Sequence, residues 1–223
     1  MNRIISIPLR ISNAYVLQGE HGTILIDTGV RGEATRILRA LHAAGVSNSA
    51  ITLIAHTHSH SDHAGGTAEL ARILGVPTAL HAADVEMAAR GTNGPVRTRG
   101  LTAKIMLPFV DLPFERYTPD VILHDGFSLT PYGVEAHVLH TPGHTPGSVT
   151  FVSAAGAVAG DVLMGGYLGG YVLPGTPGYH YFVDSIEATD ESIRRLAALE
   201  VGPIYVGHGG PLQLKTIRTK FQA

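Results

Sequence analysis

The residues with the clearest chemical potential lie in one short run, Ala55-His-Thr-His-Ser-His-Ser-Asp-His-Ala-Gly-Gly66. His58 and His60 are two residues apart, so an extended chain presents both imidazoles on the same side. Asp62 and His63 follow where the chain is expected to turn into a helix. Imidazole and carboxylate groups ligate metal ions, but four of them cannot easily converge on one ion from six residues. The spacing therefore indicates ligands for two neighbouring ions.

Each of these ions needs further ligands, and the sequence offers three candidates at the ends of predicted strands. His144 lies between two Pro-Gly turns, Asp161 ends a strand, and His208 follows the last strand within a glycine-rich turn. Three strand ends at one rim of a fold could bring these side chains to the histidine run. Two metal ions about 3.5–4 Å apart form a known catalytic arrangement.

The elements that must position these residues are short strands and amphipathic helices. Strands are predicted at residues 4–9, 14–17, 23–26, 51–55, 78–81, 121–123, 127–129, 134–139, 148–152, 157–159 and 204–206. Helices are predicted at residues 32–44, after the histidine run as far as residue 74, and at residues 185–199. Each half therefore runs from strands through a helix to another strand, which is compatible with two sheets covered by helices.

The composition of the 223 residues excludes several classes of function. There is no Cys, which rules out disulfides, thiolate ligands and a Cys nucleophile. Lys and Arg number 16 against 18 Asp and Glu, a formal charge of −2, so we expect no nucleic-acid partner and no membrane association. No stretch reaches the roughly 18–20 apolar residues of a membrane span, and residues 1–18 do not resemble a signal peptide. A cytoplasmic location is the resulting expectation.

In order and in rough spacing, the motif His58-x-His60-x-Asp62-His63 and the three distant residues resemble the ligand pattern of the metallo-β-lactamase fold superfamily. Asp27-Thr-Gly29 and the double Pro-Gly turn around His144 also resemble recurring turns of that superfamily. The likeness extends from Ala14 to Gly210. It implies an α/β (α+β) fold, a four-layer αββα sandwich with the site on one edge of the sheets, and a single domain spanning residues 1–223.

The resemblance also implies a role for each candidate residue. One ion would be held by His58, His60 and His144, the other by Asp62, His63 and His208, and Asp161 would bridge the two. His56 lies just before the pattern and is expected to be a buried or supporting residue. Asp27 is likewise expected to support the site.

A chemistry follows from two ions at such a site. They lower the pKa of a shared water, the resulting bridging hydroxide attacks a carbonyl, and the metals stabilise the developing oxyanion. Asp62 would orient this nucleophile, which makes it the expected catalytic residue as well as a metal ligand. Ligands drawn only from His and Asp suit two divalent ions, for which Zn²⁺ is our expectation, while Fe and Mn remain alternatives.

Departures from individual branches narrow the expected reaction. Asp161 stands where penicillin-type β-lactamases usually carry Cys or Ser, Met164 stands where lactonases often carry Tyr, and only 15 residues follow His208, where glyoxalase II relatives carry a glutathione-binding extension. The chain most resembles the glyoxalase II and lactonase branch, which implies hydrolysis of a small ester, thioester or lactone. The alternatives are a persulfide-dioxygenase-like oxidoreductase with one iron and a β-lactamase-type amide hydrolase.

Two segments without a clear element, residues 89–117 and 165–181, are long enough to be functional loops. The first is a candidate lid insertion. It carries five cations against two acids, which favours an anionic small-molecule substrate: Arg90, Arg97, Arg99, Lys104 and Arg116 against Asp111 and Glu115. The second carries four tyrosines, and His180 lies among them. Tyrosines suit either a substrate pocket or the face of a homodimer.

Overall fold

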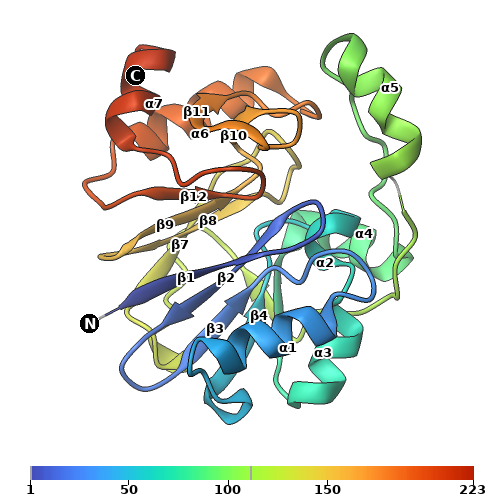
Figure 1. Cartoon of the computed structure of the whole chain (residues 1–223), viewed down its shortest axis with the longest axis vertical. Helices are drawn as coiled ribbons and strands as arrows, with labels where there is room; N and C mark the ends of the chain where they lie inside the picture. Colours follow the sequence, from blue (N-terminus) through green and yellow to red (C-terminus); the bar gives the residue numbers. More distant parts are fainter. Residues whose placement is uncertain (1, 111) are drawn as a thin grey trace.

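The computed structural model describes residues 2–110 and 112–223; Met1 and Asp111, an acid counted above in the candidate lid, lie outside the described residues. Two sheets face each other in the middle of the molecule, with helices on their outer sides (Figure 1). The first sheet has the order β1-β2-β3-β4-β5-β6. Its strands are β1 (Arg3–Pro8), β2 (Asn13–Gln18), β3 (Thr23–Ile26), β4 (Ile51–Ala55), β5 (Thr78–His81) and β6 (Val121–Leu123). The pairs from β3 to β6 are parallel.

The second sheet has the order β12-β9-β8-β7, and a separate hairpin of two strands lies beside it. Its strands are β7 (Ala136–His140), β8 (Val149–Ser153), β9 (Gly156–Gly160) and β12 (Ile204–Val206). Because β8 is antiparallel to β7 and β9, and β12 is parallel to β9, the strands β7, β9 and β12 all run in one direction. The hairpin consists of β10 (Met164–Tyr167) and β11 (Val172–Gly178).

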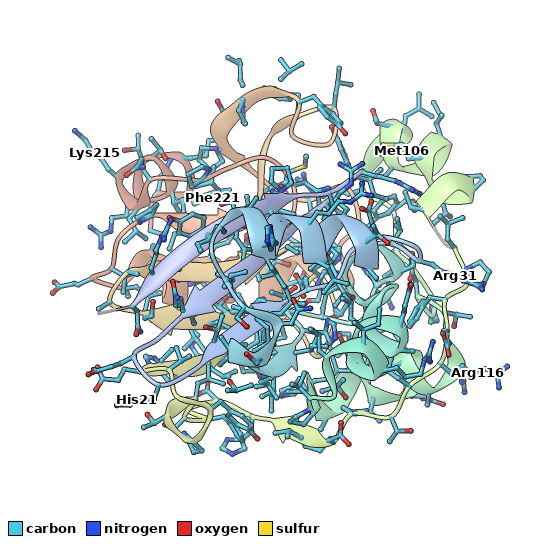
Figure 2. All side chains as sticks on the ribbon, turned by 60° about the horizontal axis from the view of Figure 1, so that its bottom comes forward. His21, Arg31, Met106, Arg116, Lys215 and Phe221 are labelled. Atoms are coloured by element: carbon cyan, nitrogen blue, oxygen red, sulfur yellow. The ribbon has the colours of Figure 1, made fainter. Side chains whose placement is uncertain are left out.

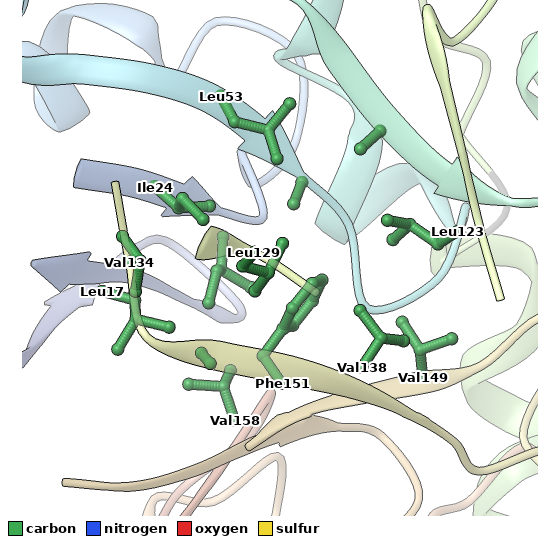
Figure 3. Close-up of a cluster of buried hydrophobic side chains, with 14 of the residues drawn as sticks. Leu17, Ile24, Leu53, Leu123, Leu129, Val134, Val138, Val149, Phe151 and Val158 are labelled. Atoms are coloured by element: carbon green, nitrogen blue, oxygen red, sulfur yellow. The ribbon is translucent and has the colours of Figure 1, made fainter. Parts of the chain in front are cut away.

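The two sheets share an apolar core. Leu17, Ile24 and Leu53 of the first sheet face Phe151 and Val158 of the second, and all five side chains are buried (Figure 3). Removing so many large apolar side chains from water is what holds the two layers together. The loops at the end of this sandwich therefore extend from two well-packed sheets.

Helices cover the outer face of each sheet. On the first sheet lie α1 (Ala34–Ala43) and α3 (Thr67–Leu74), which bury Ile37 and Leu70 against it. On the second lie α6 (Ile186–Ala197) and α7 (Leu214–Phe221). The helix α6 begins where the Ser185 side chain accepts a hydrogen bond from the amide of Ala188, as an N-cap does. The remaining helices are α2 (Ser61–Ala64), α4 (Val85–Arg90) and α5 (Gly100–Val110), with 3₁₀ turns at Asn48–Ala50, Ala82–Asp84 and Thr130–Tyr132.

The predicted α/β class and the four layers are confirmed, and most predicted strands are present within two residues of their expected bounds. Residues 127–129 were predicted as a strand, which is wrong: Ser128 forms one isolated bridge with His137 before the chain enters a 3₁₀ turn. The two unassigned segments contain regular structure, the helix α5 and the hairpin β10–β11. Among the described residues, no helix has the length and apolar character needed to cross a membrane.

Candidate metal centre

The histidine run follows the carboxyl end of β4, an interior strand of the first sheet. It has no regular structure up to His60, whose backbone is extended and which immediately precedes α2; α2 carries Asp62 and His63. The side chains of His58 and His63 are fully buried and that of His60 is 8% exposed. The loop and the short helix that follows it thus bring all four polar side chains to one place.

The three distant residues reach the same place from the second sheet. His144 follows β7, Asp161 follows β9 directly, and His208 follows β12. Since these strands run in one direction, the three side chains meet at one edge of that sheet. All three are at least 90% buried. The structure therefore brings together all seven residues that the sequence singles out.

One group of three imidazoles consists of His58, His60 and His144. Each ring has one nitrogen that lies within 4.8 Å of a nitrogen of both other rings. Nε2 of His144 is 3.1 Å from Nε2 of His58 and 2.9 Å from Nδ1 of His60. Nδ1 of His144 lies 2.7 Å from the carbonyl oxygen of Phe182, which can only accept a hydrogen bond. The proton of His144 is therefore on Nδ1, and its Nε2 carries a lone pair.

The same reasoning applies to His58. The Thr57 hydroxyl donates to the carboxylate of Asp27, so its oxygen accepts a hydrogen bond from Nδ1 of His58. Nε2 of His58 then also carries a lone pair, and it faces the lone pair of His144. Two lone pairs 3.1 Å apart repel unless a positive charge lies between them. This donor set fits a metal cation.

A second group consists of Asp62, His63, Asp161 and His208, with ligand atoms again within 4.8 Å of one another. Nε2 of His208 is 3.3 Å from Oδ2 of both Asp62 and Asp161. Nε2 of His63 and of His208 and Oδ1 of Asp161 are buried without a hydrogen-bond partner. Burying unpaired polar atoms is costly, so the two imidazole nitrogens, each within 3.4 Å of Oδ2 of Asp161, indicate a ligand that satisfies them.

The electrostatics of the two groups differ. Burial lowers the pKa of His60 to about 4 and that of His144 to about 3, so these imidazoles are neutral and free to ligate near neutral pH. Burial also acts to lower the pKa of His208, but the carboxylates of Asp161 and Asp62 raise it to about 10. The second group thus has a negative field that favours a positive charge, whether a proton or a divalent cation.

Asp161 lies at the junction of the groups. Its Oδ2 is 3.6 Å from Nε2 of His144, 3.4 Å from Nε2 of His63 and 3.3 Å from Nε2 of His208. It is also 3.4 Å from Nε2 of His180, a buried residue that forms a further group with His144 and Asp161. The sequence expectation placed His180 only near a pocket, because a histidine in a segment of Gly, Pro and Tyr carries no ligand spacing.

A layer of buried acids supports the ligands. Asp27 accepts hydrogen bonds at 2.8 Å from the amide and hydroxyl of Thr57 and from Nδ1 of His63, so Nε2 of His63 is left free for a metal. His56 is fully buried and lies 2.9 Å from the Thr67 hydroxyl, outside both ligand groups. Both residues have the supporting positions expected of them.

Asp84 is a second buried acid, which the sequence expectation missed. It accepts hydrogen bonds from the amide of Ser59 in the histidine run and from the hydroxyl of Thr145 and the amide of Gly147 in the turn around His144. It therefore ties the two segments that carry the first ligand group. An Asp at the start of a helix looks like an ordinary first-turn acid in the sequence.

The cations expected to attract an anionic substrate mostly have local partners. Arg90 pairs with Glu86, Arg97 lies 3.9 Å from Asp184, and the Arg99 guanidinium stacks on the ring of Tyr179. Such pairing reduces the positive field that this segment can offer at the cluster.

Comparison with known proteins gives a consistent family. A family model described as the metallo-beta-lactamase superfamily matches residues 7–208. The chain is 29% identical to the probable metallo-hydrolase YflN of Bacillus subtilis, over 95% of this chain and 85% of that protein. It is also 29% identical to a hydroxyacylglutathione hydrolase of Alkalilimnicola ehrlichii, over 93% of this chain and 66% of that protein.

Solved structures agree in fold. A metallo-beta-lactamase of Cronobacter sakazakii is 28% identical and superimposes with a TM-score of 0.68, covering 92% of this chain and 75% of that one. The protein TTHA1623, solved in a di-iron-bound form, is 29% identical with a TM-score of 0.67, covering 94% of this chain and 93% of that one.

Proposed function

Because the chain belongs to the metallo-beta-lactamase superfamily, we propose that it is a dinuclear metal-dependent hydrolase of a small ester, thioester or lactone. One observation carries the proposal: two groups of ligand-capable side chains lie next to each other and meet at Oδ2 of Asp161. His58, His60 and His144 would hold one ion, Asp62, His63 and His208 the other, and Asp161 would contact both. Zn²⁺ is the metal proposed, since His and Asp suit it well.

When bound, the two ions supply a nucleophile at neutral pH by lowering the pKa of water, and they stabilise negative charge on the carbonyl oxygen. The residues of the chain perform the positioning. Asp27 accepts from Nδ1 of His63, and the carbonyl of Phe182 accepts from Nδ1 of His144, so each ring is oriented with its Nε2 as the atom that would ligate a metal. Because these ligand side chains are already oriented, they do not need to rearrange during the reaction.

Asp62 is the proposed catalytic residue. Its side chain is 16% exposed, whereas that of Asp161 is 1% exposed, so Asp62 is the carboxylate of the cluster that is more open to a cavity. A carboxylate there can accept a hydrogen bond from the attacking water and hold that water toward the carbonyl carbon. The fully ionised form suits this role, and the imidazoles of His63 and His208 lower the pKa of Asp62 against the effect of burial.

The similarities support hydrolysis in different ways. The Alkalilimnicola relative is named as a hydrolase of a hydroxyacylglutathione, and TTHA1623 was solved with two irons. These are properties of those proteins, and they support a thioester-type bond and two metals for this chain. The Cronobacter structure keeps β-lactam hydrolysis as an alternative. A persulfide-dioxygenase-like reaction with one iron is the other alternative, and the complete second ligand group argues against it.

A substrate panel combined with metal analysis tests the proposal. The protein is reconstituted with Zn²⁺, Fe²⁺ or Mn²⁺ and assayed with esters, thioesters, lactones, β-lactams and glutathione persulfide. We expect two ions per chain and turnover of at least one carbonyl ester class. At most one ion in a fully loaded, active sample would refute the dinuclear site. Oxygen consumption with the persulfide and a single iron would replace the proposal with the dioxygenase alternative.

A further inference from the structure

A cavity of about 260 Å³ opens directly above the candidate metal cluster. Its floor is polar and includes Asp62, Asp161, His180 and His208. A substrate whose scissile bond reaches these residues must fill this cavity with the atoms next to that bond. The chemistry of the cavity walls therefore indicates what those atoms are.

The walls are apolar and come from two segments that are far apart in the sequence. Met106 and Val110 belong to α5, while Leu168 and Tyr171 belong to the turn between β10 and β11. The helix α5 and the hairpin lie at the same end of the molecule in both views, with Met106 labelled on α5 (Figure 1, Figure 2). Phe182 adds an aromatic ring to the lining. Lys and Arg are absent from the described residues that line this cavity.

Leu168 is placed in this wall at a conformational cost. Its φ is +51°, in the left-handed region that favours glycine, although the same hairpin uses glycine at positions 166, 169 and 170. Leu168 is also 66% exposed, so burial of its side chain within the fold does not offset the free-energy cost of that backbone conformation. A strained and exposed leucine at the rim of a cavity gains free energy when an apolar ligand covers it.

A second cavity, next to the first, has a different lining. It has a volume of about 170 Å³ and is lined by the charged residues Glu86, Arg90 and Arg97. Among the described residues, the two cavities have four lining residues in common: His60, Asn93, Val96 and Phe182. A substrate lying across the cluster therefore meets an apolar wall on one side and charged groups on the other. The two sides select for a molecule with one apolar and one polar arm.

From these observations we propose that the substrate carries a linear hydrocarbon chain next to its scissile bond, held between α5 and the β10–β11 turn. The inference rests on the proposed function, since it assigns a substrate class to the same site. Each methylene that enters the cavity is removed from water, which lowers Kd or KM by about fourfold until the chain emerges at the far end.

Binding and turnover are measured separately on the metal-loaded protein. The binding probes are linear methyl ketones from butanone to undecan-2-one, which have a carbonyl group but no bond to hydrolyse, and calorimetry gives their Kd. Turnover uses two series of linear esters, one lengthened in the acyl chain and one in the alcohol. We expect ketone affinity to rise with length and one of the two ester series to show the same dependence in KM, which identifies the side of the bond that carries the chain.

Leu173 provides a matched control for Leu168. It lies in the same hairpin, has φ +50°, is 64% exposed, and does not line the cavity. Asn adopts the left-handed region readily, so neither Leu168→Asn nor Leu173→Asn should strain the backbone. We expect Leu168→Asn to weaken long-chain ketones and long-chain esters by about tenfold, as the loss of two or so buried methylene equivalents would, with little effect on short ones. Leu173→Asn should leave both unchanged.

The outcomes separate this inference from the proposed function. If ketone affinity rises with length but no ester, thioester or lactone is hydrolysed, the apolar pocket stands and the proposed reaction is wrong. If esters are hydrolysed while affinity and KM ignore chain length, or both Asn variants act alike, the pocket assignment is wrong and the reaction stands. A rise in molecular mass or vesicle binding that both leucine variants abolish equally would assign these exposed leucines to a protein or lipid surface and overturn the inference.

Discussion

The loop after β4 and the β10–β11 hairpin both face the candidate metal cluster, but they are built in opposite ways. In the loop, His58 and His63 are fully buried, and each ring is fixed by a hydrogen bond that its Nδ1 donates to a residue behind it. In the hairpin, Leu168 and Tyr171 are 66% and 75% exposed. The difference matches the two tasks proposed for them: the buried loop would hold the metals, and the exposed rim would contact the substrate.

The largest effect is expected from the buried loop. Replacing His58 and His60 together by Ala removes two of three ligands of the first group, so activity should fall by about a thousandfold or more. The fold should persist, because the apolar core between the sheets does not depend on these rings. Metal content, hydrolysis rates and circular dichroism provide the measurements. His124→Ala with His137→Ala is the matched control, since both histidines are exposed and outside the ligand groups. Full activity of the His58/His60 variant would refute the ligand assignment.

A smaller effect is expected from Asp84, in the layer behind the loop. Burial raises the pKa of Asp84 to about 6 from an ordinary 3.8, with a contribution from nearby Asp184. Between these pH values the folded chain holds a proton that the unfolded chain has released. The stability due to this group is therefore lost as the pH rises through this window, by at most about 3 kcal/mol.

The variant Asp84→Asn cannot ionise, so its unfolding free energy should depend less on pH across this window than that of the original chain. Urea unfolding at pH about 4 and about 6, with chelator in both samples, measures the difference. Equal pH slopes for the two proteins would show that Asp84 does not titrate in this window.

Asp27 supports the second ligand group and should affect metal affinity. The Asp27 carboxylate accepts hydrogen bonds from the Thr57 hydroxyl and from Nδ1 of His63, and Asp27→Asn replaces one of its two oxygens by a donor. The ring of His63 then loses the contact that orients its Nε2 toward the metal site. We expect affinity for the second ion to fall by about 10–100-fold. Asp120→Asn is the control, because Asp120 also accepts from an amide and a hydroxyl of one threonine, Thr78, but away from the cluster. Competition with a chelator measures both variants.

The same division explains what the sequence could predict. The ligand set follows from local spacing in the histidine run and from residues at strand ends, and strand ends meet wherever parallel strands share an edge. Asp84 and His180 were missed because their partners are distant in the sequence: Asp84 joins residues 59, 145 and 147, and His180 approaches Asp161. Neither set of contacts leaves a periodic pattern.

The exposed rim was harder to predict for a different reason. An amphipathic helix such as α1 can be predicted from the sequence because its buried face carries regularly spaced apolar residues. The helix α5 instead has exposed apolar side chains at Leu101 and Ile105 and a Pro108 near its end. Its apolar residues show no separation into two faces. The hairpin is similarly obscured, because its glycines and prolines resemble a loop. Elements that are not buried against the core lack the periodicity by which a sequence reveals them.

The smallest effect is expected at the rim. Leu101 is 73% exposed and does not line the cavity, so Leu101→Ser should change the free energy of unfolding by less than about 0.5 kcal/mol. Phe151→Ala, in the core between the sheets, is the contrast and should cost about 3–5 kcal/mol. Urea unfolding of both variants measures the two values. A loss of more than about 2 kcal/mol for Leu101→Ser would mean that α5 is covered in solution, for instance by a second copy of the chain, and mass measurement on the same sample would reveal that copy. The rim would then belong to the folded core, and the division between chemistry and substrate contact would fail at α5.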